Sequence, residues 1–291
     1  MNITLKQLTV FTTTARLNGI TKAATALSMT QSAASQSLKE LENILGYPLF
    51  TRYGRKLAIN AHGQALLGKA TKMLVLQTEI QHPKTTELRG ELTVATSVTI
   101  GSYVMPQLLA EFITKHPQVE PKLMISNSEQ VTEKLMAGQA HVGLIEAPIS
   151  HQSLHLRPWR NDQLAVFCAK SHQLAKQKKI TIEEMSQQRW ILREHGSGTR
   201  AVFVNAMQQQ GGVINHSMDL ARQEAIKQTV KANLGLGVLS LLSIQQELSL
   251  GVFKQLDTPL NLNRQLSIIQ SEHYYYDPLV NAFHDFLKEK E

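Results

Sequence analysis

Amide, hydroxyl and ammonium groups recur at short spacing between residues 30 and 39 of this 291-residue chain. A glutamine amide can pair with two atoms of an adenine edge, and a lysine can reach guanine or a phosphate. Side chains of these types on one exposed helix face are therefore typical of contacts to DNA bases. The polar positions of the segment are Thr30, Gln31, Ser32, Ser35, Gln36 and Lys39.

Two short helices would have to position these side chains. From Thr30 onward apolar residues recur at steps of four, three and four, which marks one buried face of a helix and leaves the polar set on the other face. Thr30 suits the N-cap, and the segment from Thr21 to Leu27 repeats the pattern with Thr21 as its cap. Ser28 and Met29 form the turn between them. The pattern predicts a helix-turn-helix, and the alternative is an αα-hairpin in an ordinary helical core. The apolar positions of the second helix are Ala34, Leu38, Leu41 and Leu45.

The positive charge of the chain is confined to its N-terminal part. The whole chain holds 30 lysines and arginines against 23 acidic residues, a formal net charge of +7. Residues 1–90 hold eleven of the basic residues and four of the acidic ones, so the remaining 201 residues are balanced. A basic excess on the helix-turn-helix part is typical of phosphate binding, and the alternative is a solvated basic surface.

Four motifs give the N-terminal segment a family resemblance. They are LxxLxxF from Leu5, AAxxL from Ala23, Thr-Gln-Ser-Ala-Ala-Ser from Thr30, and LExxLGxxLFxR ending at Arg52. Together they closely resemble the LysR-type transcriptional regulators, although that family more often has proline where this chain has Ser32.

The resemblance implies a winged helix-turn-helix whose last helix enters the major groove of double-stranded DNA. Base-edge contacts are then expected from Gln31 and Ser35, with Gln36 and Lys39 beside them. Thr30 and Ser32 are expected at phosphates. The hairpin that follows would act as a wing, because Gly54 permits a tight turn and cations flank it. The cations expected on backbone phosphates are Arg52, Arg55 and Lys56.

Residues 61–80 have the spacing of an amphipathic helix of about twenty residues. Leu66, Met73 and Ile80 lie seven apart and form a short heptad-like seam. The alternative is a helix packed on its own domain, but the resemblance implies a dimerising linker helix. A homodimer would bring two DNA-binding domains to the two half-sites of a symmetric operator. The resemblance further implies a homotetramer.

The remaining two hundred residues alternate strand and helix, which predicts an α/β domain. Its first β-α-β-α-β run, from ELTVATSV to HVGLIEA, predicts a doubly wound parallel sheet. One helix is expected from residue 99 to 116. Two lobes with two crossings make the architecture of a periplasmic-type binding protein, which the resemblance also implies for an effector domain. The expected divisions are 1–58 for the winged helix-turn-helix, 59–88 for the linker helix and 89–291 for the effector domain, with lobe I at 89–162 and 266–291 and lobe II at 163–265.

Ligands of open α/β sheets bind beyond the carboxyl ends of the strands, and in this chain those positions are rich in hydroxyls. Glycines at 196 and 198 free backbone N–H groups at a helix start, which is a ready anion site, and Arg200 could add a charge. Taken singly, Thr99 and Ser128 could be ordinary N-caps and residues 196–199 an ordinary turn. The predicted effector-binding residues are Ser97, Thr99, Asn127, Ser128, Gly198 and Thr199.

Taken together, these residues predict a small anionic effector: a carboxylate, a phosphate or a sulfur oxyanion. Three segments, SVTIGSYVMPQLL, LIEA and REHGSGTR, also resemble the LysR branch that regulates carbon fixation and responds to sulfur oxyanions. Glu146 and Glu224 fit such a site less well, because a carboxylate repels an anion unless it binds a hydroxyl or amine or pairs with Arg200.

Other functions find little support in the sequence. Residues 235–237 lack the third glycine of a dinucleotide fingerprint, the histidines lack metal-site spacing, and Cys168 lies in an apolar strand. We therefore expect neither catalysis, nor a metal, nor a cofactor. One cysteine and no apolar run near twenty residues indicate a cytoplasmic protein without a membrane span. RNA polymerase is a further candidate partner. The alternative function is a DNA-binding architectural or repressor protein whose two-lobed domain serves only assembly.

Overall fold

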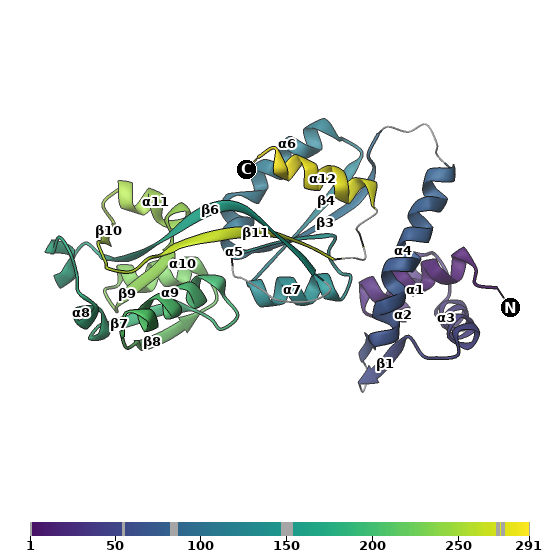
Figure 1. Ribbon diagram of the computed structural model, residues 1–291, viewed down its shortest axis with the longest axis horizontal. Coiled ribbons are helices and arrows are strands. Elements are labelled where there is room, and N and C mark those ends of the chain that lie inside the picture. The colour runs from purple at the N-terminus through teal and green to yellow at the C-terminus, as the bar shows by residue number, and fades with distance from the viewer. Residues whose placement is uncertain are drawn as a thin grey trace.

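The computed structural model describes residues 2–53, 56–81, 87–146, 154–271, 274 and 277–290. Figure 1 shows an N-terminal head and a long helix beside lobe I, with lobe II on the far side of lobe I. The head and its helix, which together we call the head, comprise α1 (Leu5–Leu17), α2 (Ile20–Ala26), α3 (Gln31–Leu45), β1 (Phe50–Tyr53), β2 (Lys56–Ile59) and α4 (Ala61–Gln81).

The helix-turn-helix forms where the apolar spacing predicts it. Ala34 and Leu41 of α3 are fully buried, and Thr30 caps the helix by accepting a hydrogen bond from the Ala33 N–H at 3.2 Å. The turn places Ser28 at a φ of +53°, a left-handed conformation that usually favours glycine. The predicted cap at Thr21 is wrong: the Gly19 carbonyl already accepts from Ala23, so the helix begins before Thr21.

Helix α4 divides into a buried and an exposed half. Leu67 and Ala70 belong to the core of the head, and Leu66, the first residue of the predicted seam, also packs there half-buried. Met73 and Ile80 are 51% and 79% exposed, and Leu76 at 46% lies between them. The exposed apolar stripe is therefore Met73, Leu76 and Ile80, and the first half of the helix packs on its own domain.

Each lobe of the effector domain carries part of one long sheet, with strand order β4-β3-β5-β11-β6-β9-β7-β8 and β10 paired to β6. Lobe I holds β3 (Gly90–Ser97), α5 (Val98–Tyr103), α6 (Met105–Lys115), β4 (Val119–Ser126), α7 (Ser128–Met136), β5 (Val142–Ile145) and α12 (Pro278–Lys288). Lobe II holds η1 (Gln173–Lys176), α8 (Ile182–Ser186), β7 (Arg189–Arg193), α9 (Gly198–Gln209), β8 (Asn215–Leu220), α10 (Gln223–Lys231), β9 (Leu236–Ser240), α11 (Leu241–Ser249) and β10 (Phe253–Leu256). The lobes are joined by β6 (Leu154–Ala169) and β11 (Asn263–Ser271).

The sheet is mixed, and its parallel part in lobe I is the one that the sequence predicts. Strands β3, β4 and β5 are parallel in lobe I, and β7, β8 and β9 are parallel in lobe II. The crossing strands β6 and β11 run antiparallel to each other and to their neighbours β9 and β5, because the chain crosses once in each direction. Strand β6 pairs with β11 through Gln163 and with β9 from Leu164, where the boundary between lobes is expected.

Two further differences from the sequence analysis trace to prolines. The single helix expected over 99–116 is broken at Val104, because Pro106 at the start of α6 cannot donate a backbone hydrogen bond to a continued helix. The first half of β6 was not expected as a strand. It contains Pro158, and the register of its pairing with β11 shifts beside Pro158, between Gln265 and Ser267.

Aromatic side chains fix the last helix to lobe I. The rings of Phe283 on α12 and Phe112 on α6 lie 5.0 Å apart, and the Trp159 indole donates to the Leu287 carbonyl at 2.9 Å. Helix α12 therefore packs on lobe I. Lobe II has a separate core around Trp190 and Phe203. Because each lobe has its own core and only two strands join them, the contacts between the lobes can change without disrupting either core.

The head also contacts lobe I directly. Arg16 of α1 pairs with Glu91 of β3 at 3.0 Å, and both side chains are about a third exposed. Leu67 of α4 packs against Gly138, where a Cβ would lie 2.8 Å from the Leu67 Cδ2 atom. Gly138 has a φ of +65° and its carbonyl accepts from the Tyr274 hydroxyl at 2.8 Å. The head therefore meets lobe I through an exposed ion pair and through close packing at Gly138.

Candidate DNA-binding surface and effector site

The exposed face of α3 carries the polar set that the sequence analysis singled out. Its side chains are exposed except that of Ser35, which is half-buried. Two of them donate hydrogen bonds along the helix: the Gln31 amide donates to the Ser35 hydroxyl at 3.0 Å, and the Gln36 amide donates to Glu40 at 2.9 Å. These hydrogen bonds are exposed, so exchanging them for base edges costs little desolvation.

The wing is an antiparallel hairpin. Arg52 on β1 pairs in register with Leu57 on β2, and Tyr53 pairs with Lys56. The side chains of Arg52 and Lys56, and the whole of Arg55, lie outside the described residues. The hairpin therefore has the predicted form, and its phosphate contacts remain a prediction.

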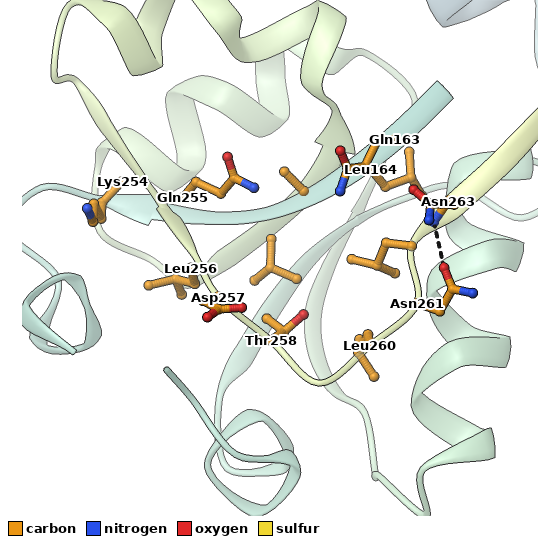
Figure 2. A pocket seen from close by; sticks show the side chains of 13 residues that line it. Gln163, Leu164, Lys254, Gln255, Leu256, Asp257, Thr258, Leu260, Asn261 and Asn263 are labelled. Carbon is orange, nitrogen blue, oxygen red and sulfur yellow. Dashed lines mark hydrogen bonds between the residues drawn. The ribbon is translucent and has the colours of Figure 1, made fainter. Parts of the chain in front are cut away.

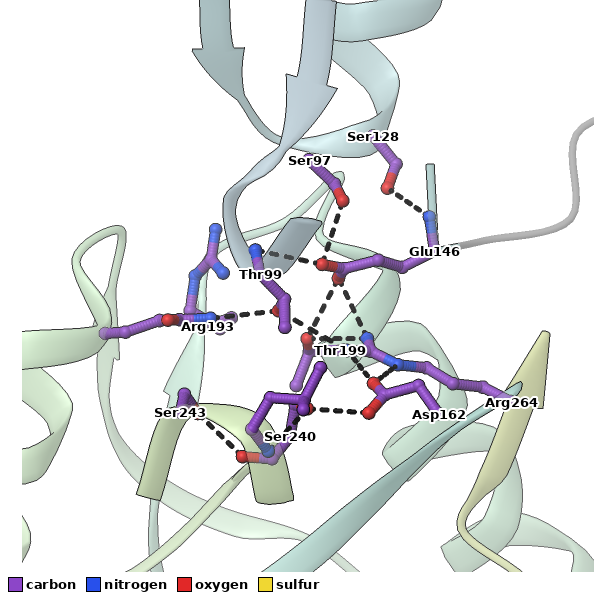
Figure 3. A network of polar contacts seen from close by, with 12 residues as sticks. Ser97, Thr99, Ser128, Glu146, Asp162, Arg193, Thr199, Ser240, Ser243 and Arg264 are labelled. Atoms are coloured by element: carbon purple, nitrogen blue, oxygen red, sulfur yellow. Dashed lines mark hydrogen bonds and ion pairs between the residues drawn. The ribbon is translucent and has the colours of Figure 1, made fainter. Parts of the chain in front are cut away.

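A buried carboxylate lies at the centre of the polar site between the lobes. One oxygen of Glu146, Oε1, accepts from the Ser97 hydroxyl at 2.8 Å and from the Thr99 backbone N–H at 3.0 Å. The other, Oε2, accepts from the Thr199 hydroxyl at 3.3 Å and from Arg264 Nη1 at 2.8 Å. Figure 3 shows these donors converging on Glu146. Since Thr199 belongs to α9 and Glu146 follows β5, the contact joins the two lobes.

Arg264 links this carboxylate to a second one. Its Nε donates to Asp162 Oδ2 at 2.6 Å, and the other oxygen of Asp162 accepts from the Ser240 hydroxyl at 2.7 Å. Arg264 lies on β11 and Asp162 on β6, so both come from the crossing strands. The Thr99 hydroxyl accepts from Arg264 at 3.3 Å and from the Gln223 amide at 3.0 Å.

Burial and charge act in opposite directions on Glu146. Burial alone would raise the pKa of this carboxyl group, but the Arg264 guanidinium, the hydrogen bonds from Thr99 and Ser97 and the nearby Arg193 together lower it. The side chains of Glu146 and Arg264 are each 2% exposed. Two carboxylates share one guanidinium here, so the network is anionic rather than cationic.

A hollow of about 620 Å³ lies beside this network, between α7 of lobe I and α9 of lobe II. We call it the interlobe hollow. Ser128 and Ser197 line it at the N-termini of the two helices. Among the described residues no hydrogen-bond partner reaches the buried Ser197 hydroxyl. The lobes meet at its edge, where the Asn127 amide donates to Glu194 and the Glu129 N–H donates to the Gly196 carbonyl, both at 3.3 Å.

The structure places the six predicted effector residues at or next to this junction. Ser97 and Asn127, rather than Thr99 and Ser128, occupy the N-cap positions. Arg200 lines the interlobe hollow, but it pairs with Asp219 at 2.6 Å and donates to the Arg193 carbonyl. Glu146 therefore pairs with Arg264 and not with Arg200.

The sequence analysis missed Arg264, Asp162 and Gln223. Arg264 and Asp162 come from crossing strands whose residues carry no motif, and Gln223 is the first residue of α10. The only sequence signal is that buried charged residues need partners, which the sequence does not identify. Glu224, the other acidic residue considered, bonds to Gln228 and Lys227 instead.

A second hollow, of about 450 Å³, lies in lobe II beneath the loop 257–262. Figure 2 shows its lining, including Asn261, whose side-chain oxygen accepts from the Asn263 backbone N–H at 3.2 Å. None of the six predicted effector residues lines it. In the described part of the chain, no group of three or more His, Cys, Asp and Glu side chains could hold a metal ion. No described helix is long and apolar enough to span a membrane.

Known proteins resemble the whole chain. The family model "LysR substrate binding domain" matches residues 85–291, and "Bacterial regulatory helix-turn-helix protein, lysR family" matches residues 5–64. YeiE of Escherichia coli K12, an uncharacterized HTH-type transcriptional regulator, is 33% identical over 99% of this chain and 97% of its own length. A RuBisCO operon transcriptional regulator of Acidithiobacillus ferrooxidans is 32% identical over 98% of this chain and 93% of its own. The CcmR regulatory domain of Synechocystis PCC6803 in complex with 2-PG covers 69% of this chain and 97% of its own at 27% identity, with a TM-score of 0.64.

A helix-turn-helix head joined to a two-lobed α/β domain with a polar site between its lobes defines a DNA-binding regulator that carries an effector domain. The chain belongs to the LysR family of transcriptional regulators. Its relatives include RuBisCO operon regulators, so the predicted carbon-fixation branch is confirmed along with the family and the fold class. The match to a substrate-binding domain favours an effector-binding role over a domain that serves only assembly.

Proposed function

We propose that this regulator binds operator DNA as a homo-oligomer and that a small anion between its lobes changes the DNA-bound state. The observation that carries the anion proposal is the convergence of donors from both lobes on one carboxylate, that of Glu146. Ser97 and Thr99 contribute from lobe I and Thr199 from lobe II. Asn127, Ser128 and Gly198 complete the site at the starts of α7 and α9, where helix dipoles favour negative charge.

Two further observations support the anion. The Ser197 hydroxyl is 4% exposed, lines the interlobe hollow and has no partner within the described structure, so it is free to bind a ligand. The CcmR regulatory domain, at 27% identity, was solved in complex with 2-PG. We propose a carboxylate, phosphate or sulfur oxyanion as the effector, with no cofactor and no catalysis.

A thermal-shift titration tests the effector site. The full-length protein is titrated with 2-PG, inorganic phosphate, sulfite and acetate. At a hundred times the dissociation constant a ligand stabilises by about 2.7 kcal/mol, which raises the melting temperature of a domain of this size by about 5–10 °C. Thr99→Ala and Thr199→Ala should reduce the shift, and Thr258→Ala in the other hollow is the matched control. Equal shifts in all variants would exclude this site, and a folded protein that responds to no anion would favour assembly alone.

For DNA, we propose that α3 reads the major groove and that Arg52, Arg55 and Lys56 hold the backbone. Met73 and Ile80 belong to an exposed stripe on α4, which suits pairing with a second copy, whereas Leu66 is packed on the head. Arg52→Ala with Arg55→Ala should weaken operator binding at ordinary salt and reduce its salt dependence by about two phosphate contacts. Gln31→Ala should instead relax base preference. Unweakened binding by the double variant would contradict the wing assignment. RNA polymerase remains a candidate partner of the DNA-bound state.

A further inference from the structure

The donors that the proposed function assigns to an effector anion already hold one. The Ser97 hydroxyl, the Thr99 N–H and the Thr199 hydroxyl all donate to the carboxylate of Glu146. Arg264 adds a charge-assisted hydrogen bond at 2.8 Å. Four donors on two oxygens, closed off from water, are what a protein offers to a bound carboxylate or phosphate. The chain supplies that carboxylate itself.

A free anion cannot simply join this arrangement. The network already has two carboxylates, of Glu146 and Asp162, on the single guanidinium of Arg264. A third negative charge in contact would be repelled strongly in a buried site. It would also find no free proton donor among the Ser97, Thr99 N–H and Thr199 groups. Binding at these donors therefore requires that Glu146 leave them.

Resting on the proposed function, we propose that Glu146 is an internal ligand that occupies the anion site until the anionic group of the effector displaces it. The exchange replaces one carboxylate by another anion on the same donors, so the net free energy of effector binding is small. Only an anion that binds these donors more strongly than Glu146 does can displace it. The interlobe hollow lies next to these donors, since Ser128 lines the hollow and accepts from the Glu146 backbone N–H at 3.5 Å.

Displacement also changes how the lobes are joined. Glu146 after β5 contacts Thr199 on α9, which ties lobe I to lobe II. Once an effector takes the same donors, the effector bridges the lobes and Glu146 does not. Glu146 therefore sets how tightly an anion must bind to occupy the site. Its displacement is also the event that changes the contact between the lobes.

Chemical rescue of Glu146→Ala in the full-length protein tests this directly, because the substitution empties the donors and leaves room for a small carboxylate. Formate should raise the melting temperature of Glu146→Ala by at least about 5 °C near saturation. It should shift the wild type by much less. Asp162→Asn is the matched control, since it removes a carboxylate from the same guanidinium but leaves Glu146 on its donors, and formate should not rescue it.

Glu146→Gln provides a second measurement if the alanine variant does not fold. The amide preserves the shape but removes the competing charge, so calorimetric titration should show inorganic phosphate binding at least about tenfold more tightly than to wild type. Asp162→Asn should gain less than Glu146→Gln. The proposal that Glu146 is an internal ligand is overturned by any one of three results. These are no rescue of Glu146→Ala by formate, an unchanged phosphate affinity of Glu146→Gln, or an equal gain in affinity in Asp162→Asn.

The two proposals fail differently. A wild type that responds to no anion contradicts the proposed effector, and formate rescue of Glu146→Ala would then still establish an anion site held by Glu146. A wild type that responds to anions, beside Glu146 variants that gain nothing, contradicts the internal ligand and leaves the effector site standing.

Discussion

Replacing Arg264 by methionine should destabilise the effector domain strongly, because the side chain is 2% exposed and its guanidinium contacts two carboxylates. Methionine fills a similar volume but leaves Glu146 and Asp162 buried without the guanidinium that contacts both. Breaking a buried ion pair by removing one partner costs about 3–5 kcal/mol. For a domain of this size that lowers the melting temperature by about 6–20 °C.

The loss should depend on pH in a defined direction. In the wild type the folded-state pKa of Glu146 is lowered, since Arg264 and the hydrogen bonds outweigh burial, so its contribution is complete above the ordinary carboxyl pKa and is lost as acid protonates it. Arg264→Met removes the largest cause that lowers the pKa of Glu146 while burial remains, so we expect that pKa to rise. The loss of unfolding free energy in the variant is then largest at neutral pH, where Glu146 is charged. The loss becomes smaller as the pH falls toward the raised pKa, because the carboxyl group becomes neutral.

Urea unfolding of the effector domain at pH 7 and pH 5 measures both effects. Lys288→Met is the control, because its pair with Asp285 is 45% and 67% exposed and is worth at most about 1 kcal/mol. Adding Glu146→Gln to Arg264→Met should restore part of the loss by removing an unpaired charge. The reasoning is refuted if Arg264→Met costs no more than Lys288→Met, or if its cost grows toward pH 5.

Three other predictions concern the rest of the molecule. Gly138→Ala should lower the free energy of unfolding by about 1–2 kcal/mol because of its left-handed φ, and by more because the new Cβ would contact Leu67. Gly211→Ala is the control: it has a φ of +72° but open space around it, so the same unfolding assay should show the cost of φ alone. Thr30→Ala should lose the N-cap bond of α3 and destabilise the head by about 1 kcal/mol, and Thr30→Ser should not; equal losses in thermal unfolding would contradict the cap. Burial raises the pKa of the Cys168 thiol to about 11, so iodoacetamide at pH 8 should label it only after unfolding; labelling of the folded protein would show the thiol to be accessible.

Local patterns were sufficient for the head. The spacing of Ala34, Leu38 and Leu41 places them on one face of α3 whatever the rest of the chain does, because helix geometry relates residues three and four apart. The same holds for the first turn, where the Thr30 hydroxyl accepts from Ala33. What the spacing could not show is which half of α4 the head covers, since that depends on where the helix leaves the core.

In the effector domain the sequence predicts the strands and the hydroxyl groups at their ends, but it does not predict which side chains these hydroxyl groups contact. Ser97, Thr99 and Thr199 follow or precede strands and helices in ways the sequence makes visible. Their acceptor, Glu146, fits poorly beside an anion by sequence alone, and Arg200, one of the two partners considered for it, is not the cation that it meets. Arg200 is near in sequence to the predicted site, yet it turns to Asp219. Proximity along the chain was a poor guide to the pairing of charges.

The sequence by itself determined the family, the alternation of strands and helices, the basic head and the hydroxyls at the strand ends, because these are properties of neighbouring residues and of their spacing. Only the tertiary structure decided that Arg264 meets Glu146 across 118 positions and Asp162 across 102. Two antiparallel crossing strands bring these groups together. A buried charge must be compensated by whatever cation the fold delivers, and that choice is made by strand order and not by local sequence.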